Sequence, residues 1–124
     1  MNTTPALTPF ATPYATRTTP AVITGATVIS IVHAGLLLAL GGMLLVGGVT
    51  VLGIASLVEG GLRLGLALAL RRGARRTRTA LLVLCLIGVG VGFAAGGLSM
   101  IGGLINFVVA RFLIHDDAKA YCAA

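Results

Sequence analysis

Four polar residues in otherwise apolar stretches have the types and positions that could do chemistry: His33, Glu59, Arg63 and Asn106. At 1.5 Å per helical residue, His33 and Glu59 each lie about 17 Å from the nearer charged end of their predicted helices, and so level with each other. Glu59 precedes Arg63 by four residues, which places both on one helix face in the order that favours an ion pair. Asn106 falls at a depth similar to that of Arg63. The spacing predicts one polar layer that joins three helices.

Charged groups at the middle of a bilayer cost several kcal/mol when they face lipid, so we expect this polar layer to face the protein interior and to pair. Glu59 and Arg63 are expected to neutralise each other, His33 to donate to Glu59, and Asn106 to bridge to Arg63. No second acidic residue lies in an apolar tract, which leaves few groups for a proton relay. We therefore favour structural linkage or partner docking for this layer, with ion or proton handling as the alternative.

Motifs for catalysis, cofactors or metals are absent from the sequence. The Gly-rich run at 88–92 lies inside an apolar helix, where dinucleotide binding is implausible. No acidic residue is placed to complete a serine triad with His33. Cys85 and Cys122 lack metal-ligand spacing, and a disulfide between them is not expected. We predict a protein that is not an enzyme and that carries no cofactor.

Composition places the chain in a membrane. Of its 124 residues 57% are hydrophobic and 10% are charged, and its mean hydropathy is +1.06. A soluble domain carries charge on about 25% of its residues. Two apolar tracts, Ala21–Leu70 and Ala80–Ile114, hold most of the sequence. Because a spanning helix needs about 20 apolar residues, the first tract is long enough for two spans and the second for two short ones. We predict a multi-pass protein of the cell membrane.

The expected fold is an all-α bundle of four transmembrane helices arranged as two hairpins. Glycine pairs at Gly47-Gly48 and Gly96-Gly97 are the expected turns, and Thr77 or Thr79 the expected cap of the third helix. The predicted helices run approximately over Ala21–Val46, Val49–Leu70, Thr77–Ala95 and Leu98–His115. The alternative for the second tract is one tilted helix of about 35 residues, whose length of over ~50 Å greatly exceeds the hydrocarbon core.

Three segments are expected along the chain. Residues 1–20 contain recurrent Thr-Pro pairs and predict an extended or disordered leader, because proline at that density blocks a helix. Residues 21–115 form the transmembrane domain. Residues 116–124 form a short tail of mixed charge, into which a helix could continue for a turn or two.

Five of the eight arginines lie between the two apolar tracts, and this position predicts the topology. They are Arg71, Arg72, Arg75, Arg76 and Arg78. A basic loop stays in the cytoplasm, so four spans place both termini there. The same side chains are expected to contact anionic lipid headgroups. Nucleic acid is not an expected partner of arginines that lie between apolar tracts.

Small residues recur at four-residue spacing on two of the predicted helices. Gly61 and Gly65 do so on the second helix, and Gly88, Gly92 and Gly96 on the third. Such spacing forms a groove where another helix backbone approaches closely, as in a glycine zipper. These faces either hold the bundle together or dock other copies or a partner.

The arginine loop, the run Leu104–Val109 and the ending Ala118–Tyr121 resemble a group of small four-helix membrane proteins from actinobacteria and archaea. The resemblance covers about residues 21–122 and implies the topology alone; the chain departs from the group in lacking tryptophan. In outline the chain is also similar to phage holins and to type IV secretion pilins.

These observations favour a small accessory or assembly protein that acts through helix contacts, as a homo-oligomer or within a larger membrane complex. The alternatives are a holin-like pore or ion-conducting element and a pilin-like filament subunit. Against the holin, the strongest basic cluster is internal; against the pilin, 50 residues precede the arginine loop in one tract.

Overall fold

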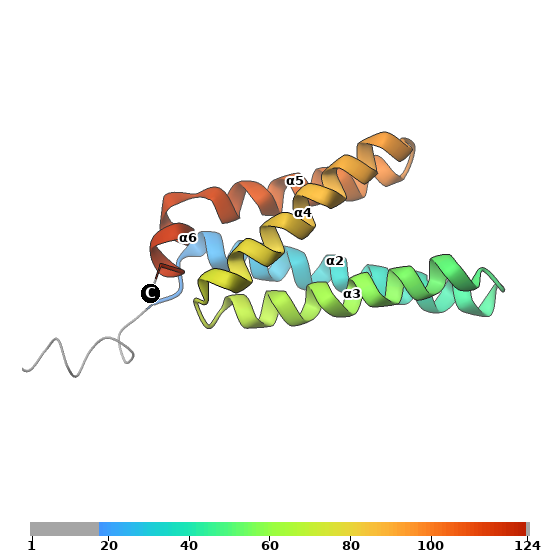
Figure 1. Cartoon of the computed structure of the whole chain (residues 1–124), viewed down its shortest axis with the longest axis horizontal. Coiled ribbons are helices and arrows are strands. Elements are labelled where there is room, and N and C mark those ends of the chain that lie inside the picture. The colour runs from blue at the N-terminus through green and yellow to red at the C-terminus, as the bar shows by residue number, and fades with distance from the viewer. Residues whose placement is uncertain (1–17, 124) are drawn as a thin grey trace, which may run out of the picture.

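The computed structural model describes residues 18–123, and in this part of the chain the secondary structure is entirely helical. The predicted leader falls on residues 1–20, of which 1–17 lie outside the described residues. The helices are α2 (Ala21–Val46), α3 (Thr50–Leu70), α4 (Arg75–Ala95), α5 (Ser99–Ile114) and α6 (Asp116–Tyr121) (Figure 1). The all-α prediction is confirmed. The second apolar tract forms two helices, so its alternative interpretation as one long helix is wrong.

Three of these helices, α2, α3 and α4, are long and apolar enough to cross a membrane. Helix α5 is also apolar but has only 16 residues. Many large apolar side chains on all of these helices face outward, as expected where lipid replaces water. The chain is therefore a multi-pass membrane protein.

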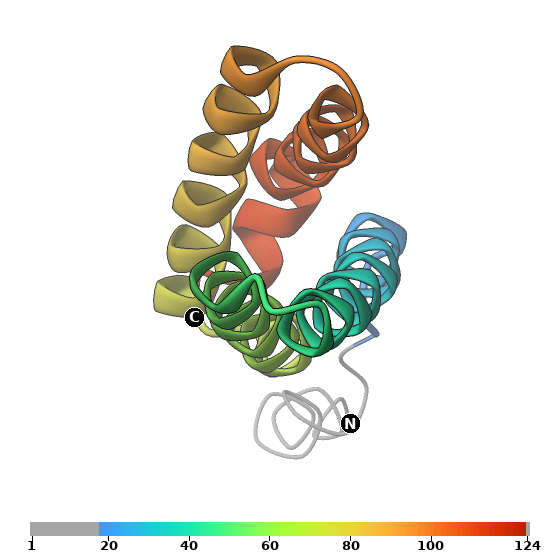
Figure 2. The ribbon, with the colours of Figure 1, turned by 90° about the vertical axis from the view of Figure 1, so that its right-hand side faces the viewer.

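The four apolar helices form two antiparallel hairpins, α2–α3 and α4–α5, which contact each other through α2 with α5 and α3 with α4. The hairpins meet at the end that holds the Arg71–Arg78 segment, here called the arginine end, and spread apart toward their turns (Figures 1 and 2). Positive φ angles at Gly48 (81°), Gly96 (68°) and Gly97 (57°) make these turns, in a region that side-chain-bearing residues rarely adopt.

The start of α4 differs from the sequence prediction. The helix begins at Arg75, preceded by extended Ala74, and no side chain caps it. Thr79 instead donates its hydroxyl to the Arg75 carbonyl inside the helix, at 3.1 Å. The prediction that Thr77 or Thr79 caps this helix is wrong, because the helix extends back through the arginines, which are good helix formers.

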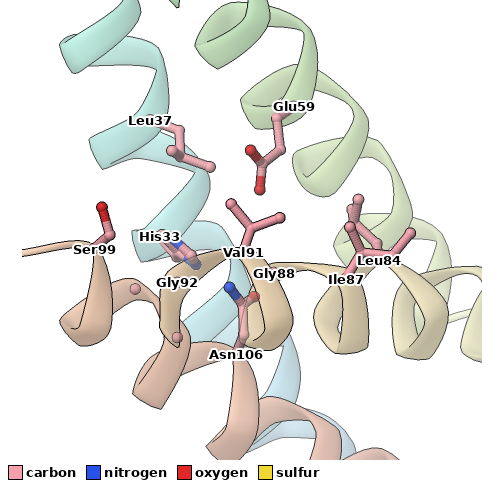
Figure 3. Close-up of a pocket in the computed structure, with 12 residues that line it drawn as sticks. His33, Leu37, Glu59, Leu84, Ile87, Gly88, Val91, Gly92, Ser99 and Asn106 are labelled. Carbon is pink, nitrogen blue, oxygen red and sulfur yellow. The ribbon is translucent and has the colours of Figure 1, made fainter. Parts of the chain in front are cut away.

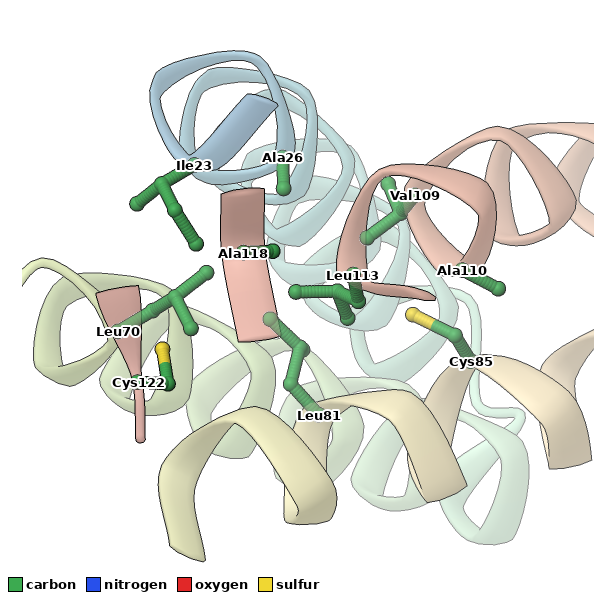
Figure 4. Packing of buried hydrophobic residues seen from close by; sticks show 10 residues of the cluster. All are labelled: Ile23, Ala26, Leu70, Leu81, Cys85, Val109, Ala110, Leu113, Ala118 and Cys122. Carbon is green, nitrogen blue, oxygen red and sulfur yellow. The ribbon is translucent and has the colours of Figure 1, made fainter. Parts of the chain in front are cut away.

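Apolar side chains fill the bundle at the arginine end (Figure 4). This arginine-end cluster comprises Ile23, Ala26, Leu70, Leu81, Cys85, Val109, Ala110, Leu113, Ala118 and Cys122. Helix α6 folds back onto it, and the Tyr121 hydroxyl donates to the Arg71 carbonyl. Arg78 Nη1 donates to the Leu113 carbonyl at 2.9 Å, which links the start of α4 to the end of α5. Both hairpins are thus fastened at this end.

Glycines permit close approach within each hairpin. A Cβ added at Gly41 of α2 would lie 2.9 Å from the Gly53 carbonyl oxygen of α3. A Cβ added at Gly92 of α4 would lie 2.7 Å from the Ser99 carbonyl oxygen and 2.8 Å from the Gly103 Cα of α5. These are backbone atoms, so a side chain at either position must push the two helices apart.

We expect Gly92→Ala to destabilise the protein by about 1–3 kcal/mol, the usual cost of overpacking, because its Cβ meets the backbone of α5. Gly90→Ala is the matched control: a Cβ there has no atom within 4 Å, so the helix-favouring alanine is tolerated. Thermal unfolding of the two variants in detergent, followed by circular dichroism, checks this. Equal melting temperatures for the two variants would contradict the observed α4–α5 contact.

Candidate functional site

A cavity of about 340 Å³ lies between the two hairpins and is lined by residues from all four apolar helices, α2, α3, α4 and α5 (Figure 3). Its polar lining consists of His33 from α2, Glu59 from α3, and Ser99 and Asn106 from α5. The remaining lining is apolar or glycine: Leu37, Leu84, Ile87, Gly88, Val91, Gly92, Gly102 and Gly103. The Glu59 carboxylate and the Asn106 amide point into this space from opposite sides (Figure 3). Three residues of the predicted polar layer therefore share one cavity.

The fourth residue, Arg63, lies fully buried and is held by two side chains. Its Nη2 is 3.2 Å from Glu59 Oε1, so the predicted ion pair is present. Its Nη1 donates to Cys85 Sγ of α4 at 3.6 Å. The Glu59 side chain is 40% exposed and keeps contact with the cavity. Arg63 thus neutralises the acidic wall of the cavity and connects α3 to the second hairpin.

Two hydrogen bonds expected from the sequence are not formed: that of His33 to Glu59 within the first hairpin, and that of Asn106 to Arg63 between the hairpins. Among residues 18–123, buried His33 Nδ1, Asn106 Oδ1 and Arg63 Nε have no hydrogen-bond partner. His33 is 8% exposed and Asn106 is 3% exposed. The predictions that His33 donates to Glu59 and that Asn106 bridges to Arg63 are therefore wrong. The cavity separates these groups, and the amide of Asn106 lies over Gly88 instead.

Sequence reasoning missed two features of this site. The sequence assigns Cys85 neither a metal nor a disulfide, but in the structure its sulfur is the second acceptor for Arg63. Thr27, Ser30 and His33 are buried at three-residue intervals on α2, and their side chains contain polar atoms without partners. That spacing was visible in the sequence as a polar stripe on one helix face.

The structure separates the predicted packing glycines into two groups. Gly88 and Gly92 pack against α5 within the chain, and Gly96 forms the turn that follows α4. Gly61 and Gly65 lie exposed on the outer face of α3, where a Cβ would have no atom within 4 Å. Their role in helix packing stays a prediction, which concerns contacts outside this chain.

The arginines between the hairpins also differ among themselves. Arg71, Arg72, Arg75 and Arg76 are exposed at the arginine end. Arg78 is partly buried and bonds to the Leu113 carbonyl, so this side chain serves the fold. Four of the five predicted headgroup residues are therefore accessible to lipid or solvent.

The site offers hydrogen bonding in an apolar setting. Within residues 18–123 no group of three or more His, Cys, Asp or Glu residues could hold a metal ion. The cavity supplies a neutralised carboxylate, an imidazole, an amide and a hydroxyl. These groups can donate hydrogen bonds to, and accept them from, a bound molecule or a partner helix. The molecule or helix needs no charge to make these bonds.

Removing one member of the Glu59–Arg63 pair should damage the protein more than removing both. Glu59→Leu leaves Arg63 charged and buried, which costs about 3–5 kcal/mol. Glu59→Leu combined with Arg63→Met leaves no uncompensated charge and should recover most of that loss. The melting temperatures of both variants in detergent measure the difference. A double variant no more stable than Glu59→Leu would show that the ion pair does not govern stability at this position.

Comparison of the chain with protein-family models, with curated proteins and with solved structures finds no match. Two features of the described structure bear on function. These are the polar cavity between the hairpins and the open glycine face of α3.

Proposed function

We propose that this protein is a small accessory or assembly subunit of the cell membrane, with four spans and both termini in the cytoplasm. The observation that carries this proposal is the open face of α3. Gly61 and Gly65 lie there side by side with exposed Val58 and Leu62, and no part of the described chain covers them. In lipid, helices associate through such small-residue faces by close packing of their backbones.

The distribution of charge and the path of the chain support four spans. The arginine end holds Arg71–Arg78 together with Arg111 and Lys119, whereas the turns at Gly47–Gly48 and Gly96–Gly97 carry no charge. Helix α5 returns to this end, since its Leu113 carbonyl accepts from Arg78. Its 16 residues measure about 24 Å, which a locally thinned bilayer accommodates. By the positive-inside rule the arginine end lies in the cytoplasm, where its exposed arginines meet anionic headgroups.

Ion or proton conduction is the second candidate, and the shared cavity of His33, Glu59 and Asn106 favours it. Two observations oppose it. The arginine-end cluster consists of fully or almost fully buried side chains, which leaves the space between helices filled on that side. Arg63 neutralises Glu59, so the cavity lacks an uncompensated acidic group to attract a cation. The accessory function therefore remains the stronger proposal.

Self-association or complex formation should depend on the outer face of α3. Gly61→Ile combined with Gly65→Ile should weaken association by about tenfold or more, or about 1.4 kcal/mol, because branched side chains prevent backbone contact. Gly35→Ile combined with Gly90→Ile is the control: both glycines are exposed and open, but they lie on α2 and α4. Energy transfer between labelled copies in liposomes, with co-purification in mild detergent, measures association. Equal association of both variants and the wild type would refute this face as an interface.

Expression in a bacterial host should leave the membrane potential unchanged, because the arginine-end cluster fills the bundle on one side. A potential-sensitive dye, read during induction, makes the measurement, and the Glu59→Gln variant is its comparison. Prompt depolarisation by the wild type that Glu59→Gln abolishes would establish conduction through the cavity and overturn the accessory proposal.

A further inference from the structure

We infer that the cavity between the hairpins binds an uncharged, lipid-soluble ring compound that carries carbonyl or hydroxyl groups, the chemical class of membrane quinones and quinols. The inference rests on the cavity and its unpartnered polar atoms. It does not depend on the proposed assembly function, which rests on the outer face of α3.

The cavity contains polar side chains that lack hydrogen bonds. The side chains of His33 and Asn106 line it, and neither the imidazole nor the amide makes a hydrogen bond within residues 18–123. A buried polar atom without a partner costs about 1–3 kcal/mol, and a hydrocarbon chain cannot supply the missing bond. Both side chains are more than nine-tenths buried, so they cannot turn toward the headgroups. The occupant therefore carries hydrogen-bonding groups of its own.

The charges at the cavity favour an uncharged occupant. The cavity holds one carboxylate, from Glu59, and Arg63 already pairs with it at 3.2 Å. The Glu59–Arg63 pair has no net charge, so neither a cationic nor an anionic ligand gains much from it. An uncharged ligand also avoids the cost of entering the bilayer interior with a charge.

The side chains of His33 and Asn106 in the cavity lie near the middle of their helices. His33 is 12 residues from the start of α2 and 13 from its end, or about 18–20 Å from either side. Asn106 likewise lies near the middle of α5. Phospholipids and fatty acids hold their polar groups in the interfacial region, about 15 Å from the centre of a 30 Å core. A molecule whose oxygens sit on an uncharged ring dissolves in the hydrocarbon interior and brings them to this depth.

The cavity has room for a ring, and neighbouring cavities connect it to the surface of the bundle. Besides the 340 Å³ cavity, His33 lines two further cavities of about 180 and 400 Å³ between α2 and α5. Their walls are apolar apart from His33 and Ser99, and include the exposed side chains of Leu36 and Ile101. Ligand sites range from about 300 to 1,000 Å³, so the first cavity suits a substituted ring. The other two provide a route by which an apolar tail reaches the bilayer.

The available groups match both oxidation states of such a ring. Ring carbonyls accept from the Asn106 amide and from an imidazole N–H of His33. Ring hydroxyls donate to the Glu59 carboxylate, which faces the Asn106 amide across the cavity (Figure 3). The inference covers binding alone, and no electron transfer is assigned to this chain.

The test uses the full-length protein in detergent with a benzoquinone that bears a ten-carbon tail, its quinol, and decylbenzene as the ring without oxygens. We expect the quinone or quinol to raise the melting temperature saturably by several degrees, since a ligand that binds only the folded state stabilises it. Decylbenzene at the same concentrations should have no such effect. An absence of stabilisation by both oxygenated rings, or equal stabilisation by decylbenzene, overturns the inference.

Variants then locate the site. His33→Leu and Asn106→Leu should each raise the half-saturating concentration about tenfold, as expected for loss of one ligand hydrogen bond worth ~1.4 kcal/mol. Leu37→Trp should abolish binding by filling the cavity, while Leu62→Trp, an exposed leucine on the outer face of α3, should bind normally.

Leu37→Trp and Leu62→Trp keep every polar group of the cavity, so they test the inference even if His33→Leu and Asn106→Leu do not fold. Equal binding by both tryptophan variants would overturn the assignment to this cavity. The Gly61→Ile, Gly65→Ile double variant should still bind, which separates the failure of this inference from failure of the assembly proposal.

Discussion

The buried guanidinium of Arg63 is the constraint on which the rest of the structure depends. An arginine at mid-membrane is tolerated only when it faces the protein and finds partners there. Arg63 takes one partner from its own helix, Glu59, and one from the other hairpin, Cys85. This requirement turns one face of α3 inward and brings α4 beside it. Helices that are apolar on nearly every side have little else to set their rotation.

The two hairpins are joined at one end and spread apart toward the other (Figure 1). The arginine-end cluster, α6 and the bond from Arg78 to the Leu113 carbonyl hold that end together. Toward the turns the hairpins spread, and the polar residues at mid-height are left around a cavity (Figures 1 and 3). His33 and Asn106 lie at this cavity, where polar side chains from both hairpins share one space.

Local features of the sequence were predictable, and contacts between hairpins were not. The helices follow from hydropathy and glycine turns, and the Glu59–Arg63 pair from its four-residue spacing, all of which involve neighbours in the chain. The expected bond of Asn106 to Arg63 depends on the distance between hairpins, and that of His33 to Glu59 depends on how α2 and α3 are rotated against each other. Helix rotation was equally hidden, because lipid accepts the apolar residues on every face. For this reason Gly88 and Gly61 have the same four-residue spacing in the sequence, although Gly88 packs against Asn106 of α5 and Gly61 lies in open space.

The inner and outer faces of α3 are linked by geometry. Each helical residue turns the chain by about 100°, so residues two apart lie about 200° around the helix and on opposite faces. Gly61 follows Glu59 by two residues, and Gly65 follows Arg63 by two. The ion pair that holds Glu59 and Arg63 toward the interior of the bundle consequently places the glycine pair on the outer face. Any rotation of α3 that improved one face would spoil the other, so the buried charge specifies which surface the protein presents to its surroundings.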